Sequence, residues 1–147
     1  METREVRRIL VTAIGSFAAP AVIRELKKEG CCVVGTDVNP AELLSESTEV
    51  QAFYQLPRCD AREEYLQKLS AVIQREQIDG ILPLTDAELD VLGADTEQLG
   101  GALLLAPSGE LLQRARHKKQ SKEAAEAVFR RAGNERFATI PTFKVPH

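Results

Sequence analysis

Two hydrophobic patterns alternate from one end of the chain to the other. Short apolar runs have the length of buried strands, and between them apolar residues recur every three or four positions, as on one face of a helix. Ala19, Val22, Ile23 and Leu26 form the first of these helical stripes. The pattern predicts five strands, at residues 6–12, 32–36, 52–56, 80–84 and 102–106.

Proline and glycine bound the first predicted helix. Pro20 fits only in the first turn, where its missing N–H costs no hydrogen bond, so the helix should begin near Phe17. Gly30 should end it, because glycine readily adopts the left-handed backbone that closes a helix. The last helical stripe of the chain should stop at Gly133 for the same reason.

Two pairs of residues have the spacing of a helix-capping box, in which the two side chains bond to the first turn reciprocally. Asp60 with Glu63 precedes the second predicted helix, and Thr85 with Glu88 opens the third. A further helix should begin at residues 107–108. The second helix carries a stripe that we expect to be buried, formed by Tyr65, Leu66, Leu69, Val72 and Ile73.

The order of these elements defines the fold class. Apolar strands that alternate with amphipathic helices through short loops indicate an α/β fold. We expect a doubly wound, Rossmann-like sheet of five parallel strands with helices on both faces. The run at 102–106 is fully apolar, which predicts a strand covered on both faces.

The composition is that of an ordinary globular protein. The 147 residues are 44% hydrophobic and 28% charged, which suits one domain with a self-supporting core. A net charge of -3 argues against a nucleic-acid binder, and no apolar run approaches the ~20 residues of a membrane helix. The charged start shows no signal peptide, so we expect a cytoplasmic protein.

The residues do not assemble into a metal site or a nucleophilic catalytic set. Cys31, Cys32 and Cys59 lack metal-ligand spacing, and neighbours in a strand point to opposite faces, so buried, inert thiols are expected. His117 and His147 have no evident partner for nucleophilic catalysis. We expect no catalytic residue and no metal ligand in this chain.

Three polar residues follow strands of the predicted sheet. Ser16 comes after the first strand, Asp37 after the second and Asp86 after the fourth. In an open parallel sheet, ligands bind beyond the carboxyl ends of the strands, near the point where the strand order reverses. Ser16, Asp37 and Asp86 are therefore our candidate substrate cleft.

Two of these positions also have a purely structural interpretation. Gly15 and Ser16 could hold an anion at a helix N-terminus, although a tight turn with a capping serine is the commoner arrangement. Asp37 lies 22 residues after Gly15, close to the spacing of an acid that binds a dinucleotide ribose, but it could instead cap the turn at Asn39. The G-x-G-x-x-G fingerprint of dinucleotide sites is missing.

The charges are unevenly distributed. Residues 114–131 contain seven basic and two acidic side chains, a net charge of +5, so the rest of the chain carries -8. Such a segment is most often the solvated face of a helix, but it could also meet a phosphate or an acidic partner.

Several segments, taken in order, form a recognisable set. They are ILVT at 9–12, VIRELKKEG at 22–30, VVGTDVNP at 33–40, IDGILP at 78–83, TDAEL at 85–89, LAPS at 105–108, the helix at 117–129 and IPT at 140–142. This ordered set, which covers residues 7–143, resembles the start of ATP-grasp ligases, with the carbamoyl-phosphate-synthase-like branch as the nearest kin.

The resemblance implies that residues 1–133 form a pre-ATP-grasp domain and that residues 134–147 begin the linker or strand into an ATP-grasp domain. In such ligases this domain is one wall of the cleft, whereas ATP lies between later subdomains with magnesium on their acidic residues. The implied reaction activates a small-molecule carboxylate as an acyl phosphate, which an amine attacks. This chain alone should then be inactive and bind no cofactor tightly.

The resemblance also implies one nucleotide contact and one partner. These families carry an Asp-Lys or similar pair at the start of the helix that leads into the ATP-binding region, and its basic residue approaches the phosphates. Here the pair is His117 and Lys118, so Lys118 matches and the aspartate is replaced. The expected partner is the rest of the ligase, and a homo-oligomer is compatible with the sequence.

Two other functions stay open at this point. The chain could be a stand-alone small-molecule or nucleotide-binding module that uses the cleft of Ser16, Asp37 and Asp86. It could also be a non-catalytic interaction domain whose basic segment binds an acidic partner.

Overall fold

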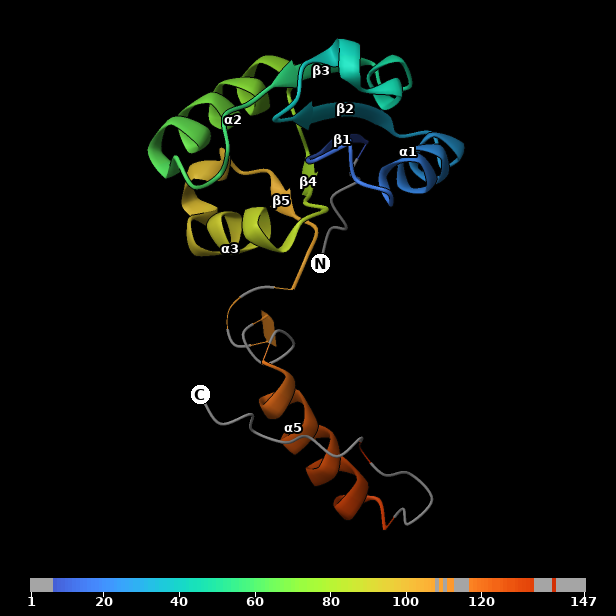
Figure 1. Ribbon diagram of the computed structural model, residues 1–147, viewed down its shortest axis with the longest axis vertical. Helices are drawn as coiled ribbons and strands as arrows, with labels where there is room; N and C mark the ends of the chain where they lie inside the picture. The colour runs from blue at the N-terminus through green and yellow to red at the C-terminus, as the bar shows by residue number, and fades with distance from the viewer. Residues whose placement is uncertain (1–6, 108, 110, 113–116, 134–138, 140–147) are drawn as a thin grey trace. The chain divides into compact units, whose positions relative to one another are not determined.

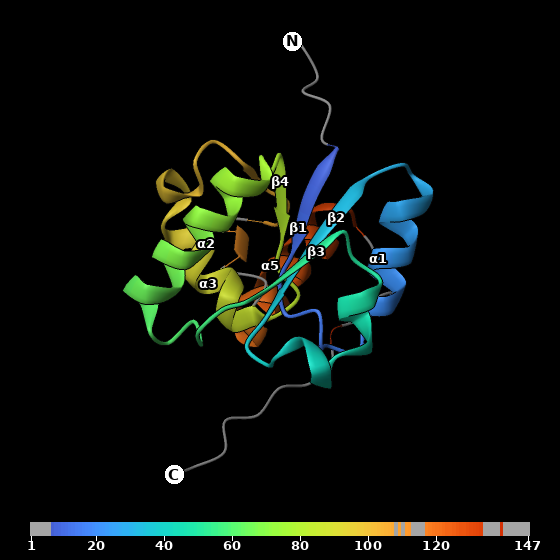
Figure 2. The ribbon, with the colours of Figure 1, turned by 90° about the horizontal axis from the view of Figure 1, so that it is seen from above.

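Figures 1 and 2 show the protein as a computed structural model, in which residues 7–107, 109, 111–112, 117–133 and 139 are described. The chain divides into two compact units, Met1–Ala106 and Pro107–His147. Ser108, Arg114, Arg116 and nearly all of the segment 134–147 lie outside the described residues, so the linker expected at 134–147 stays a prediction.

The first unit is built on a sheet of five strands in which each neighbouring pair is parallel. The strand order is β3-β2-β1-β4-β5, so β1 is central and the direction of winding reverses between β1 and β4. The predicted parallel sheet is confirmed, with some strand ends shifted. The strands are β1 Arg8–Val11, β2 Cys32–Asp37, β3 Ala52–Gln55, β4 Gly80–Leu82 and β5 Leu103–Leu104.

Helices cover both faces of this sheet, as predicted. The chain winds outward from β1 through β2 to β3 and then crosses back to β4, which places α1 on one face and both α2 and α3 on the other (Figure 2). The connections are α1 Ala19–Lys28, η1 Ala41–Leu43, η2 Ser45–Thr48, α2 Arg62–Glu76, α3 Asp86–Ala94 and η3 Thr96–Leu99.

The core consists of two clusters, one on each face of the sheet. Successive residues of β1 point to opposite faces, so Ile9 and Val11 pack with Ile23 of α1. Leu10, which is fully buried, packs with Leu69 in the cluster beneath α2 and α3. All five residues of the predicted stripe on α2 are buried.

The first helix ends as predicted but begins later. Gly30 has a φ of +78°, and its N–H donates to the carbonyl of Lys27 while that of Cys31 donates to Leu26, which closes the helix. The helix starts at Ala19 rather than near Phe17, with Pro20 as its second residue. The residues before Ala19 instead form a turn, in which the N–H of Ser16 donates to Ala13.

One local prediction is wrong, and another holds only in part. Asp60 and Glu63 form no capping box, because α2 begins after Ala61 without a side-chain cap and Asp60 pairs with Arg58 at 3.1 Å. The run at 102–106 is covered on both faces only in part. Leu104 packs against one core cluster and Leu105 against the other, whereas Leu103 of the two-residue edge strand β5 is 44% exposed.

A hydrogen-bonded cluster ties the end of α2 to β1 and β3. The Glu76 carboxylate accepts hydrogen bonds from the Tyr54 hydroxyl at 2.5 Å and the Arg8 guanidinium at 2.7 Å. The guanidinium of Arg75 lies 5.8 Å from the centre of the Tyr54 ring. The hydrogen bond from Tyr54 lowers the pKa of Glu76, with Arg8 acting in the same direction and burial opposing both.

In the second unit, α5 spans Lys118–Arg131 and the chain turns at Gly133, where φ is +59°, as the sequence predicts. None of its residues is buried. Among the described residues, no helix combines the length and the apolar character needed to cross a membrane.

The cluster around Glu76 predicts a pH-dependent stability. Tyr54→Phe removes one hydrogen bond and should lower the free energy of unfolding by about 1 kcal/mol at pH 7. A carboxyl group whose pKa is lowered in the folded state stabilises the fold above its unfolded pKa of about 4.3, and this contribution disappears as the pH falls through the folded value. The cost of Tyr54→Phe should therefore shrink on acidification, as measured by urea unfolding.

The same substitution in a Glu76→Gln background is the control, and it should show little pH dependence between pH 7 and pH 3. A cost of Tyr54→Phe that stayed constant over this range in the otherwise unchanged chain would contradict the assigned role of Glu76.

Candidate functional site

The carboxyl ends of β1, β2 and β4 form the edge at which a doubly wound sheet places its ligands, because the winding reverses between β1 and β4. Ser16, Asp37 and Asp86 stand where the sequence predicts them, after or at the end of these three strands. The loop from Thr12 to Ala18, which joins β1 to α1, runs along this edge and is called the β1–α1 loop.

Asp37 holds the β1–α1 loop from the side of β2. Its side chain is 6% exposed, and Oδ2 accepts a hydrogen bond from the Gly15 backbone N–H at 2.8 Å. Oδ1 accepts from the backbone and side-chain nitrogens of Asn39, at 2.8 and 2.9 Å. Both carboxylate oxygens of Asp37 thus accept hydrogen bonds from the chain itself. The turn-capping interpretation requires this arrangement, whereas the ribose-binding interpretation does not.

Gly15 permits this close approach. A Cβ atom at position 15 would lie 2.8 Å from Cδ2 of Leu44 and 3.1 Å from Oδ2 of Asp37. A side chain there would push the carboxylate away from the backbone N–H that it accepts from. The glycine therefore serves the contact between two loops, and this explains it without a bound phosphate.

The start of α1 offers little to an anion. The N–H of Ala19 donates to the carbonyl of Ser16, and Pro20 has no N–H, so two of the first helical donors are unavailable. Ser16 Oγ is buried and makes no hydrogen bond within the described part of the chain. A phosphate at this turn would therefore lack its main backbone N–H donors. Among the described residues, the hydroxyl of Ser16 has no hydrogen-bond partner.

Glu88 holds the β1–α1 loop from the other side. It is 8% exposed, and its carboxylate accepts hydrogen bonds from the hydroxyls of Thr12 at 2.9 Å, Thr85 at 2.8 Å and Tyr65 at 3.1 Å. The N–H of Glu88 in turn donates weakly to the Thr85 hydroxyl at 3.4 Å. Half of the predicted capping box is thus present, while the carboxylate accepts from the hydroxyl of Thr85 and also faces inward to Thr12 and Tyr65.

The carboxylate of Glu88 sets the chemistry of its neighbours. Burial, followed by the charge of Glu88 and its hydrogen bond, raises the pKa of Tyr65, which therefore stays protonated and donates. Burial raises the pKa of the Cys59 thiol, with Glu88 acting in the same direction, so Cys59 is a weak nucleophile. The cluster positions side chains rather than activating one of them.

The loop held between Asp37 and Glu88 is itself strained. Ala13 has a φ of +52°, in the left-handed region that costs a non-glycine residue roughly 1–2 kcal/mol. Ile14 anchors the same stretch, since it is fully buried and its N–H donates to the Thr36 carbonyl at 3.1 Å. Strain that is held in place by its surroundings is typical of functional loops.

Sequence spacing assigns Glu88 a capping role and places only its neighbour Asp86 in the candidate cleft. Asp86 is exposed in the first turn of α3, whereas Glu88 is buried two residues later. The hydroxyl of Thr12 lies 76 residues away in the sequence, so no local pattern links it to Glu88. A hydrogen bond connects Asp37 to the β1–α1 loop, but a shared ligand of Ser16, Asp37 and Asp86 stays a prediction.

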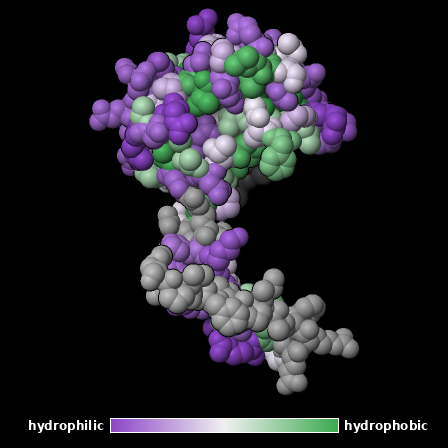
Figure 3. Space-filling model, viewed as in Figure 1, coloured by the Kyte–Doolittle hydropathy of each residue, from purple (hydrophilic) through white to green (hydrophobic). Residues whose placement is uncertain are grey.

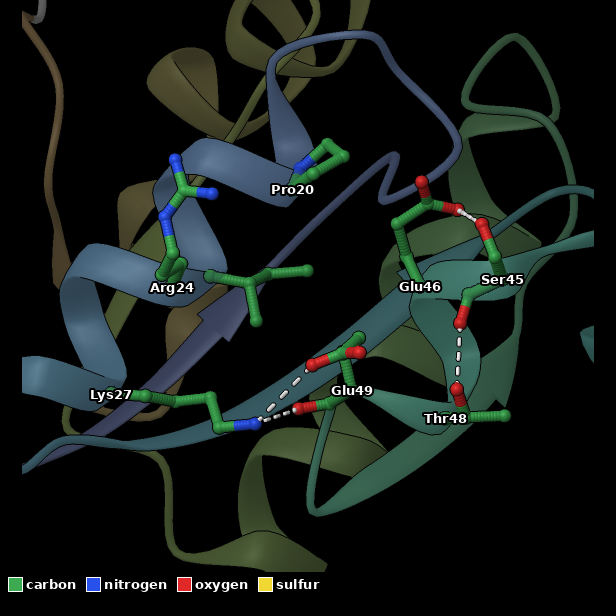
Figure 4. Close-up of a pocket in the computed structure, with 8 residues that line it drawn as sticks. Pro20, Arg24, Lys27, Ser45, Glu46, Thr48 and Glu49 are labelled. Carbon is green, nitrogen blue, oxygen red and sulfur yellow. Dashed lines mark hydrogen bonds and ion pairs between the residues drawn. The ribbon is translucent and has the colours of Figure 1, made fainter.

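A groove of about 500 Å³ lies between α1 and η2 (Figure 4). Lys27 on one wall donates to the Glu49 carbonyl at 2.9 Å and lies 3.5 Å from its carboxylate on the other. The Glu46 carboxylate accepts from the Ser45 hydroxyl at 3.1 Å. The groove contains both positive and negative side chains, and some of them already pair with each other. It therefore lacks the excess charge of one sign that would select a charged substrate.

Lys118 is the first residue of α5 and is exposed, and in the part of the chain that is described it makes no ion pair. Lys122, one turn further on, lies 3.8 Å from the carboxylate of Glu126. Lys119 is 3.9 Å from Glu123. Lys118 is therefore the described lysine of this helix whose charge is not offset by a neighbouring acid.

The described residues do not fit a magnesium ion. Within them, no three His, Cys, Asp or Glu side chains are grouped closely enough to hold a metal. The oxygens of Asp37 and Glu88, the two buried acids at the sheet edge, already accept hydrogen bonds from the chain.

Comparison with known proteins identifies the class of domain. A family model described as the PylC-like N-terminal domain matches residues 9–102, well over half of the sequence, and the chain belongs to this family. A search of curated proteins finds no match. The family and the fold together confirm the predicted resemblance to the N-terminal, pre-ATP-grasp domain of ATP-grasp ligases.

Solved structures share this fold at low sequence identity. The urea amidolyase of K. lactis has a TM-score of 0.63 at 19% identity, over 83% of this chain and 8% of its own. The L-amino acid ligase of Bacillus licheniformis has a TM-score of 0.62 at 14% identity, over 89% and 31%.

A third neighbour is the biotin carboxylase domain of 2-oxoglutarate carboxylase from Hydrogenobacter thermophilus, in complex with MgADP, ADP and bicarbonate. Its TM-score is 0.61 at 19% identity, over 88% of this chain and 28% of its own. The chain thus spans less than a third of each of these proteins. At such identities the likeness shows the fold alone.

The buried cluster predicts unequal effects for two acids on the same helix. Glu88→Gln replaces a carboxylate oxygen with an N–H donor that faces hydroxyl donors, and should lower the free energy of unfolding by about 2–3 kcal/mol. Asp86→Asn changes the same charge at an exposed position near the helix N-terminus and should cost at most about 1 kcal/mol. Urea unfolding of both variants tests this, and equal losses would show that Glu88 does not anchor the site.

Proposed function

We propose that this chain is the N-terminal domain of an ATP-dependent carboxylate–amine ligase of the carbamoyl-phosphate-synthase-like branch. The match of residues 9–102 to a family of N-terminal domains carries the proposal. The named neighbours support it, since one is an amino acid ligase and another is described in complex with MgADP and bicarbonate. ATP and magnesium are accordingly proposed for the parent protein, outside the described residues.

The proposed reaction has two steps. A carboxylate oxygen of the substrate attacks the γ-phosphorus of ATP, which releases ADP and leaves an acyl phosphate. An amine then attacks the acyl carbon, inorganic phosphate departs with its electron pair, and the amine loses a proton to give the amide. The described residues of this chain supply no metal ligands for these steps, so the chain alone should be inactive.

The contribution of this chain is one wall of the reaction cleft. Asp37 and Glu88 fix the β1–α1 loop, so both are positioning residues rather than substrate ligands. Ser16, with its unused buried hydroxyl, and Asp86, exposed at the start of α3, are the proposed substrate contacts. A loop held in this way presents its groups to a substrate without an ordering cost.

A dinucleotide-binding module is the alternative that the site argues against. Both oxygens of Asp37 are engaged in the turn, and the start of α1 lacks the donors that a pyrophosphate needs. The alternative of an interaction domain rests on the basic charge of residues 114–131 alone, and such a segment is most often the solvated face of a helix.

The reaction class is tested by isotope transfer. The parent ligase, supplied with an ¹⁸O-labelled carboxylate substrate, ATP, Mg²⁺ and the amine, should place one ¹⁸O atom in the inorganic phosphate released. The 147-residue chain under the same conditions should release no ADP above background, since positive charge and metal around the phosphates are missing. Unlabelled phosphate from the parent, or ATP turnover by the chain alone, would contradict the proposal.

Lys118 is proposed to approach the phosphates of ATP in the parent protein. Another lysine on the same helix is the control for this role. In the parent, Lys118→Ala should raise the KM for ATP about tenfold, the value of one charge-assisted hydrogen bond. Lys122→Ala removes the same charge from a side chain already paired with Glu126 and should change KM less than threefold. Similar effects of the two substitutions in steady-state kinetics would show that the basic stretch is only a solvated face.

A further inference from the structure

The outer edge of β3 has no neighbouring strand. β3 is the last strand in the order β3-β2-β1-β4-β5, so it pairs only with β2 (Figure 1). The N–H of Leu56, directly after the strand, donates to the Asp37 carbonyl of β2 at 2.9 Å. Alternate residues of a strand bond to the same neighbour, so the backbone groups of Phe53 and Gln55 point away from β2. Within the described part of the chain these groups have no hydrogen-bond partner, and the edge is a template for one more strand.

A groove lies between this edge and α2. Two hollows of about 230 and 390 Å³ form it, and they adjoin because Gln55, Leu56 and Lys68 line both. We call it the β3 groove. Its base is apolar, since Leu56 and Val72 are buried, and Figure 3 shows that hydrophobic side chains reach the surface of this unit among hydrophilic ones. An apolar base beside free backbone groups suits an extended peptide.

The charged side chains that line the β3 groove are all positive. They are Arg58, Lys68 and Arg75, and none of the described residues that line it is acidic. The surroundings have the opposite sign, because the residues outside 114–131 carry a net charge of -8. The groove is thus a basic strip within a part of the chain that is acidic overall, and such a strip attracts and orients negative partners.

Two of these cations have an acidic neighbour outside the groove. Lys68 lies 2.7 Å from Glu64, and Arg58 lies 3.1 Å from Asp60. More than half of each of these four side chains is exposed, and ion pairs in water contribute little free energy. Both cations can therefore turn to an acidic ligand at small cost.

The third cation, Arg75, is held in place without an ion pair. Its guanidinium lies over the ring of Tyr54, and the described residues give it no carboxylate partner within ion-pair distance. Glu76, the next residue, bonds to Arg8 and Tyr54 instead. Arg75 therefore offers its charge to a ligand from a fixed position.

We propose that the β3 groove binds an extended, acidic segment of a partner protein, which adds to the sheet as a strand beside β3. The backbone of the segment pairs with Phe53 and Gln55, and its Asp or Glu side chains meet Lys68 and Arg75. These two cations lie seven residues apart on α2, about 10 Å, so acids on one face of a five-residue strand, about 13 Å long, reach both. The inference goes beyond the proposed function and does not depend on it.

A second copy of this chain is a poor occupant of the groove. Antiparallel pairing of β3 with itself around a twofold axis would place Lys68 and Arg75 of both copies at one interface, where like charges repel. The strand itself, Ala52–Gln55, contains no acidic residue to offset them. A purely apolar segment fits no better, because it would cover the cations without pairing them.

Binding of a designed peptide to the 147-residue chain tests the proposal. The probe is a fluorescein-labelled nonapeptide in which glutamate alternates with valine, and fluorescence anisotropy measures its Kd. Arg75→Gln should raise the Kd about fivefold, as the loss of one solvent-exposed ion pair predicts. Arg24→Gln removes the same charge from α1, on the other face of the sheet, and should change the Kd less than about twofold. A probe with lysine in place of glutamate should not bind.

The amides of Phe53 and Gln55 distinguish strand addition from charge attraction alone. Hydrogen exchange at both should slow about tenfold or more when the probe is saturating. N-methylation of alternate probe residues should abolish binding for one set and spare it for the other, because only one set of amides faces β3. No saturable binding, equal Kd values for Arg75→Gln and Arg24→Gln, unchanged exchange at both amides, or self-association of the chain that the probe does not displace would overturn the proposal.

Discussion

The fixed position of the β1–α1 loop is the constraint on which the candidate site depends. Two buried carboxylates act on this loop from opposite sides: Asp37 at the end of β2 accepts from the Gly15 N–H, and Glu88 on α3 accepts from the Thr12 hydroxyl. The loop follows the central strand, beside the point where winding reverses and where such sheets place their ligands.

The two carboxylates do not depend on a buried cation. Glu88 is solvated by three hydroxyl groups and Asp37 by three N–H groups, so neither leaves an uncompensated charge in the interior. These hydrogen bonds hold the loop in place although the left-handed backbone at Ala13 costs free energy. Phe17 of the same loop lies outside the core. A domain that forms one wall of a cleft benefits from such rigidity, because its partner then closes on a defined surface.

Sequence periodicity predicted what depends on local pattern. The five strands, their parallel order, the buried stripe of α2 and the glycine that ends α1 all follow from hydrophobic spacing and backbone preference. The long-range side-chain bonds could not be predicted in this way. The spacing of Glu88 predicts a capping role, yet its carboxylate points inward because it accepts hydrogen bonds from Thr12 and Tyr65 on distant elements. Asp60 pairs with the neighbouring Arg58 instead of capping α2.

Hydrogen exchange at the Gly15 amide tests the two-sided constraint most directly. If Asp37 and Glu88 hold the loop together, this amide should be protected, Asp37→Asn should reduce its protection, and Glu88→Gln should reduce it too, although Glu88 does not touch Gly15. Asp86→Asn should leave it unchanged. A Gly15 amide that exchanges at the rate of an exposed peptide, or that does not respond to Glu88→Gln, would contradict the account.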